Sequence, residues 1–222
     1  MIDIRLAAAR FETVRPGVTT RHCFSSGVHY EPDNTAFGPV LAVDEHVLAP
    51  GAGFGRHAHR GVEIVSWVLA GSLRHEESSG RTELVAPGTA LCQSTGSGIV
   101  HVERNASDAH LLHFVQMMVM GEITPPDHLL GAPPLRVGGG DFAVLCPVPP
   151  VELAAAAYLH LFVTNGRVSA AGRRLQTGDS ARVRDQALTV AGRGQVLVWR
   201  SVEPRSAGHL TRGRPGGTEV ET

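Results

Sequence analysis

The sequence predicts an all-β protein, built as a barrel or a sandwich. Short apolar runs recur along the 222 residues and are separated by Gly, Pro, Asn and Asp, whereas signals for helices are scarce. The second half repeats the style of the first, because residues 168–179 follow the same order of turn, strand and turn as residues 79–88. A chain of this length can hold two domains of about 100 residues each. We therefore interpret it as two similar small β-barrels side by side.

Ten segments carry the pattern of a strand. In the first half they lie at residues 40–48, 62–69, 71–76, 83–86, 89–94 and 110–119, and in the second half at 142–146, 158–164, 182–183 and 195–199. Three turn signals separate some of them: Ser-Ser-Gly at 78–80, Ala-Pro-Gly at 86–88, and Asn165-Gly166, which is typical of a two-residue hairpin. Residues 151–158 are compatible with one helical turn or with the start of a strand.

The stretch at residues 122–150 is rich in Pro and Gly and indicates a linker between the two halves. We place a first domain at residues 1–122 and a second at 123–204. The remaining residues, 205–222, are polar and rich in Gly and Pro, which predicts a loose tail or a docked coil.

Composition and charge exclude several classes of partner. The net charge of −1 and the pI near 6.9 argue against a general electrostatic attraction to nucleic acid or to an anionic membrane. No apolar run reaches the roughly 18 residues that span a bilayer, and the N-terminus lacks the pattern of a signal peptide. Cys23, Cys92 and Cys146 are scattered, which favours a reducing compartment. We expect a cytoplasmic protein without direct nucleic-acid or membrane binding.

Two pairs of polar residues are the strongest indication of chemistry. His57 and His59 are two residues apart, and so are His101 and Glu103. On a strand, side chains at this spacing point to the same face, so each pair would converge on one site. A single His-x-His pair is often no more than a half-buried strand that carries histidine, but a second pair argues against that alternative. Three imidazoles and a carboxylate suit a divalent first-row metal.

The flanking residues resemble the two cupin motifs. Gly51, His57, His59 and Glu63 match the first motif, and the second is matched by Gly98, His101 and Asn105. More narrowly, residues 57–63, 68–75 and 95–103 are similar to the pirin family of bicupins. The sequence departs from that family at Ala58, where Pro is common, and at Val102, where Ser is common. Neither change removes a ligand.

The resemblance implies two stacked, jelly-roll-like cupin barrels in one chain. The first domain would hold one metal through His57, His59, His101 and Glu103, and the second would hold none, since His128, His160 and His209 are isolated in sequence. Fe(II) is the metal we favour, although Zn, Mn, Ni, Co or Cu could occupy the same ligands.

Three nearby residues receive other roles. We expect Glu63 either to support the ligands from behind or to be structural, rather than to bind the metal itself. His75 lies in a polar segment, so we expect it to be exposed. His113 alternates with apolar residues, which predicts an interior position with a satisfied ring.

The resemblance also implies an activity, that of a quercetin 2,3-dioxygenase acting on a flavonol-like aromatic with dioxygen. Glu103 would then be catalytic, both as a ligand and as a general base for the substrate hydroxyl. Two alternatives remain open: a non-enzymatic regulator that senses metal or redox state through a protein partner, and a metal-binding cupin that has lost efficient catalysis.

Overall fold

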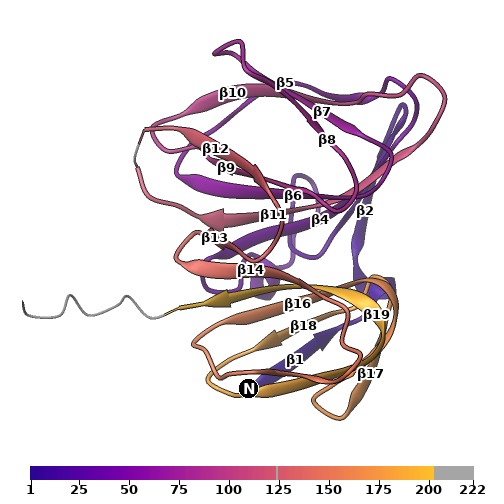
Figure 1. Cartoon of the computed structure of the whole chain (residues 1–222), viewed down its shortest axis with the longest axis vertical. Helices are drawn as coiled ribbons and strands as arrows, with labels where there is room; N and C mark the ends of the chain where they lie inside the picture. Colours follow the sequence, from indigo (N-terminus) through magenta and orange to yellow (C-terminus); the bar gives the residue numbers. More distant parts are fainter. Residues whose placement is uncertain (124, 203–222) are drawn as a thin grey trace, which may run out of the picture.

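The computed structural model describes residues 1–123 and 125–202, which form nineteen strands and two short 3-10 helices, η1 (Ala7–Ala9) and η2 (Pro32–Asn34). The strands lie in two stacked groups (Figure 1). The predicted all-β fold is confirmed. The part of the chain that the structure describes contains no helix long and apolar enough to cross a membrane. The predicted tail at 205–222 lies outside the described residues.

The first group consists of two sheets that face each other (Figure 1). The larger has seven strands in the order β12-β9-β6-β11-β4-β3-β2, and the smaller has four in the order β5-β10-β7-β8. Their bounds are β2 (Phe11–Arg15), β3 (Val18–His22), β4 (Val40–Leu48), β5 (Gly53–His59), β6 (Val62–Ala70), β7 (Leu73–Glu77), β8 (Thr82–Val85), β9 (Ala90–Ser94), β10 (Ile99–Asn105), β11 (Leu112–Met120) and β12 (Asp127–Gly131).

The second group is one eight-stranded sheet. Its main path runs β1-β18-β16-β19-β14-β13, while β15 pairs with β19 and β17 pairs with β16. Their bounds are β1 (Ile2–Arg5), β13 (Leu135–Val137), β14 (Gly140–Leu145), β15 (Val151–Leu153), β16 (Leu159–Ala170), β17 (Arg173–Gln176), β18 (Ser180–Val183) and β19 (Leu188–Ser201). Aliphatic side chains such as Leu161, Val163 and Val196 form a buried cluster of this sheet.

Two strands pair across the predicted division at residue 122. Strand β1, at the start of the chain, pairs with β18 of the second group, and β12, which follows residue 122, pairs with β9 of the first group. All other strands pair on their own side of the division. The division into domains 1–122 and 123–204 stays a prediction, but β12 already shows that residues after 122 contribute to the first barrel.

The two groups share one apolar cluster. It joins Val65 and Met117 of the first group to Phe142, Phe162 and Trp199 of the second. The indole Nε1 of the fully buried Trp199 donates to the Val137 carbonyl at 2.9 Å, so its polar atom is satisfied. Because this cluster is continuous, burial of apolar surface holds the two groups together.

One turn prediction is wrong. Residues 165 and 166 lie inside strand β16, which pairs with β19 on both sides of them. The register shifts between Val163 and Asn165, and Gly166 uses its positive φ of 82° at this irregularity rather than at a hairpin turn. The chain reverses instead at Ala171 and Gly172, which both have positive φ. The other two predicted turns are confirmed, at 78–80 and 86–88.

Candidate metal centre

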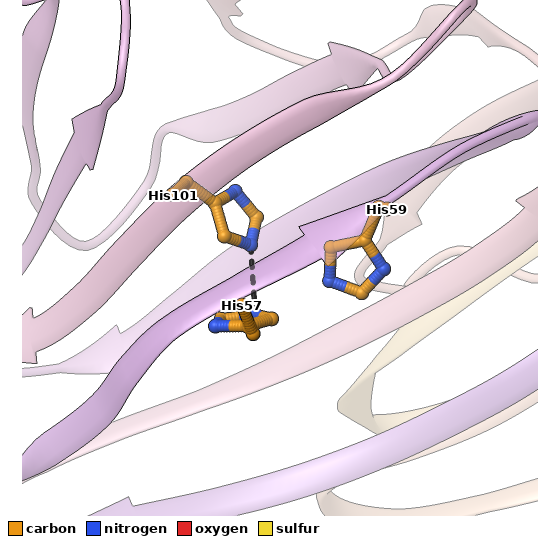
Figure 2. Close-up of side chains that lie close together, drawn as sticks. All are labelled: His57, His59 and His101. Atoms are coloured by element: carbon orange, nitrogen blue, oxygen red, sulfur yellow. Dashed lines mark hydrogen bonds between the residues drawn. The ribbon is translucent and has the colours of Figure 1, made fainter.

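Three histidines converge on one side of the four-stranded sheet. Strand β5 carries His57 and His59, and the neighbouring strand β10 places His101 directly opposite His57. One ring nitrogen of each lies within 4.8 Å of the other two (Figure 2). His101 is buried at 1% exposure, while the other two rings are half-buried. The predicted convergence of the three imidazoles is therefore present in the structure.

A close approach of the two backbones makes this arrangement possible. Gly53 begins β5 beside β10, and a Cβ atom at this position would collide with the carbonyl oxygen of Glu103 and lie 2.7 Å from the Cα of Arg104. The pairing of β10 with β5 also shifts register between His101 and Glu103. Such bulges often redirect a side chain beside a functional site.

Hydrogen bonds fix which nitrogen of two histidines is free. The Nδ1 atom of His57 lies 2.7 Å from the Gly55 carbonyl oxygen, and Nδ1 of His101 lies 2.9 Å from the side-chain oxygen of Gln93. Both oxygens are acceptors, so each Nδ1 donates its hydrogen. In the neutral ring the lone pair is then on Nε2.

These two lone pairs face each other, and their separation shows whether the residues fit a metal. The Nε2 atoms of His57 and His101 are 2.8 Å apart (Figure 2). Two acceptor nitrogens at this distance repel unless a proton or a cation lies between them. Burial lowers the pKa of His59, and burial also lowers that of His101, to about 4, so these rings favour the neutral form that binds metal. The donor set fits a divalent transition metal.

Glu103 lies beside the three histidines but outside their closest set. Its carboxylate oxygens are not among the ligand atoms that lie within 4.8 Å of one another, which belong to the three histidines. Both oxygens accept from Nε2 of Gln116, at 3.0 and 3.1 Å, and Oε1 lies 3.7 Å from Nδ1 of His75. Burial alone would raise the pKa of Glu103, but the His75 and His101 rings and Gln116 lower it to about 2. The carboxylate is therefore ionised, and its role as fourth ligand stays a prediction.

The predicted exposure of His75 is wrong. Its ring is 1% exposed and its centroid lies 4.7 Å from that of His101. Strand β7 alternates a buried Leu73, an exposed Arg74 and a buried His75, so the ring shares the inward face of Leu73. This alternation is visible in the sequence and places His75 inside despite its polar neighbours.

Of the other two residues, Glu63 makes a structural contact, whereas His113 is less buried than predicted. The Glu63 side chain accepts from the Gly138 backbone N–H at 2.8 Å, so it ties β6 to the segment before β14, in keeping with a structural role. The ring of His113 is 32% exposed, which is more than predicted, but its Nε2 is satisfied by Glu45 at 2.8 Å.

Comparison with known proteins places this chain in a family. The family model described as Pirin matches residues 5–119. A Mycobacterium tuberculosis protein, named for a proposed quercetin 2,3-dioxygenase activity, is 37% identical to this chain. The alignment is 229 positions long and covers 89% of this chain and 94% of that protein. The protein named quercetin 2,3-dioxygenase from Escherichia coli K12 is 35% identical over 128 residues, which cover 56% of this chain and 55% of that one.

Solved structures agree with this assignment. The crystal structure of the bacterial pirin YhhW from Escherichia coli in complex with nickel(II) superposes with a TM-score of 0.84 at 26% identity, covering 90% of this chain and 99% of that one. A Geobacillus kaustophilus structure, at 19% identity and a TM-score of 0.70, shares the fold. The fold, the matched residues and the relatives lead to one conclusion: the chain belongs to the pirin family.

Proposed function

We propose that this chain is a metal-dependent dioxygenase that acts on a flavonol-type aromatic substrate. The observation that carries the proposal is the pair of Nε2 lone pairs of His57 and His101 that face each other at 2.8 Å, with His59 completing the set. The names of the relatives support the reaction class, and the nickel bound by YhhW supports a divalent metal. We place the metal in the domain at residues 1–122 and none in the domain at 123–204.

His57, His59 and His101 would hold the metal, with Glu103 as fourth ligand and Fe(II) as the favoured ion. A bound divalent ion supplies a Lewis acid for the adjacent hydroxyl and carbonyl oxygens of a flavonol and, as Fe(II), an electron donor for dioxygen. The protein supplies neutral imidazoles, an ionised carboxylate and the hydrogen bonds that orient them.

Glu103 is the residue we propose as catalytic. Gln116 donates to both of its oxygens, which holds the plane of the carboxylate. A pKa of about 2 keeps the group ionised, as a ligand must be, but makes it a weak base. We therefore assign it first to binding and second to accepting the proton of the substrate hydroxyl, where it acts as an oriented acceptor.

Oxygen uptake tests this function. The protein is reconstituted anaerobically with Fe(II), mixed with quercetin and exposed to dioxygen, with His59→Ala as the comparison. Uptake by the wild type that is lost in the variant supports the dioxygenase. Metal binding without uptake refutes it and leaves the two alternatives, a regulator that senses metal or redox state through a protein partner and a metal-binding cupin that has lost efficient catalysis.

A further inference from the structure

A chain of polar residues leads away from His101 to Gln93, then to Glu77 and His128. Gln93, Glu77 and His128 have no part in the function proposed above. Nδ1 of His101 lies 2.9 Å from the Gln93 oxygen, the Gln93 amide nitrogen lies 2.6 Å from Oε1 of Glu77, and the same Oε1 lies 2.6 Å from Nδ1 of His128. Gln93 is 3% exposed, and the His128 side chain is 1% exposed.

Both sheets of the first barrel contribute to this chain of polar residues. Glu77 and His101 are directly opposite each other on β7 and β10 of the four-stranded sheet. Gln93 and His128 are directly opposite each other on β9 and β12 of the seven-stranded sheet. The side chains therefore meet across the interior of the barrel, where a polar group without a hydrogen-bond partner is costly because water does not replace the lost bond.

The carboxylate of Glu77 determines how the Gln93 amide is oriented. An ionised carboxylate only accepts hydrogen bonds, so the NH₂ group of Gln93 must face Glu77. The Gln93 oxygen then faces His101 and accepts from its Nδ1. The reverse orientation would place two acceptor oxygens 2.6 Å apart, where they repel.

The same amide sets a second histidine. The Gln93 nitrogen also lies 3.0 Å from Nε2 of His75, and since this nitrogen is a donor, Nε2 of His75 must accept. The hydrogen of the neutral His75 ring is then on Nδ1, which faces Glu103 at 3.7 Å. One carboxylate thus determines the tautomers of two rings, each of which adjoins the candidate metal centre.

His128 holds the Glu77 carboxylate in the position from which it orients the Gln93 amide. Its Nδ1 contacts Glu77, and its Nε2 lies 3.2 Å from Glu83 on β8. Since β12 follows the predicted division at residue 122, a segment outside the predicted metal-binding domain completes the arrangement.

We infer that Glu77, anchored by His128, is a positioning residue that acts through Gln93 to present Nε2 of His101 to the metal and the N–H of His75 to Glu103. This inference rests on the proposed metal centre. Glu77 is separated from that centre by Gln93, so its effect on the metal is indirect.

The test compares Glu77→Gln with Glu76→Gln. Both variants exchange a carboxylate for an amide of the same shape, but Glu76 is on the other face of β7, where it pairs with Arg74 at 2.6 Å. In Glu77→Gln the Gln93 amide is free to reverse. We expect about a tenfold weaker affinity for Ni(II) in Glu77→Gln, measured by titration calorimetry, and no change in Glu76→Gln.

Histidine ¹⁵N spectra of the metal-free protein give a readout that does not depend on catalysis. We expect Nδ1 of His101 to carry a hydrogen in all molecules of the wild type and of Glu76→Gln, and in only part of the molecules of Glu77→Gln. A fully protonated Nδ1 with unchanged Ni(II) affinity in Glu77→Gln would overturn the inference, and so would a wild-type ring whose Nδ1 carries no hydrogen.

A second variant covers the case in which Glu77→Gln does not fold. Gln93→Leu removes the acceptor of His101 directly and should give the same partial loss of the Nδ1 hydrogen and the same loss of affinity. A fully protonated Nδ1 in this variant would also overturn the inference. If the wild type shows the expected tautomer but binds no Ni(II), the proposed metal centre fails while the assignment of Glu77 to the His101 tautomer survives.

Discussion

Replacement of Gly53 by Ala tests the close approach of β5 and β10 on which the candidate metal centre depends. The new Cβ would collide with the Glu103 carbonyl and lie 2.7 Å from the Cα of Arg104, whereas 3.4 Å is the start of ordinary contact, so the strands must separate by at least about 0.7 Å. Overpacking of this kind costs about 1–3 kcal/mol of unfolding free energy. The separation also exceeds the roughly 0.2 Å that metal–ligand distances tolerate.

The measurement has two parts, urea denaturation of the metal-free protein and calorimetric titration with Ni(II). We expect Gly53→Ala to lose about 1–3 kcal/mol of stability and about 10- to 100-fold in Ni(II) affinity. Gly55→Ala is the matched control, because it lies on the same strand and its Cβ would meet nothing within 4 Å. Equal stability and equal affinity in the two variants would refute the argument that the site depends on this approach.

Three further predictions concern the metal, the buried His160 of the eight-stranded sheet, and Glu103. Ni(II) at about 100 times its Kd should stabilise the wild type by about 2.7 kcal/mol and raise its Tm, and this gain should vanish in His59→Ala. The Tm is measured by differential scanning fluorimetry, and an equal increase in both proteins would mean that the ion binds elsewhere. His160 is 0% exposed, and neither ring nitrogen has a hydrogen-bond partner in the described part of the chain. Burial, aided by the charge of Arg182, lowers its folded pKa from 6.5 to about 3. The unfolded chain therefore binds the proton first as the pH falls below 6.5, so His160 costs stability progressively between pH 6.5 and 3. Between pH 7 and 5 this contribution is about 2 kcal/mol, and His160→Phe should lose that much less stability over the same interval in urea denaturation. A constant packing effect of the substitution cancels in this comparison, so an equal pH dependence would contradict the assignment. Glu103→Gln should lower Ni(II) affinity about 10- to 100-fold, while Glu12→Gln, which removes an exposed carboxylate on β2, should not; unchanged affinity in Glu103→Gln would remove Glu103 from the ligand set.

The sequence predicts ten of the nineteen strands and the convergence of the three histidines, because both depend on local spacing. Strand β4 has the predicted bounds, 40–48, and the two-residue spacing of His57 and His59 directs both rings to one face. The alternation of β7 also directs His75 inward, and it outweighs the polarity of the neighbouring residues.

The residues across the barrel could not be predicted in the same way. Gln93, Gln116 and His128 enter the interior of the barrel from the facing sheet, and which strands face each other is a non-local property that residue spacing does not encode. His128 is isolated in the sequence and contacts Glu77 only because β12 pairs with β9. The prediction of a hairpin turn at Asn165-Gly166 is wrong for a related reason, since pairing of β16 with β19 overrides the local preference for a turn.

Metal quantitation after anaerobic reconstitution with Fe(II) tests the central claim most directly. The wild type and His59→Ala are desalted to remove loosely bound iron, and the iron per chain is measured. The account predicts one equivalent in the wild type and a large loss in the variant, because His57, His59 and His101 supply the converging nitrogens. Wild-type protein that is folded but retains no stoichiometric metal, with Fe(II) or with Ni(II), would contradict it.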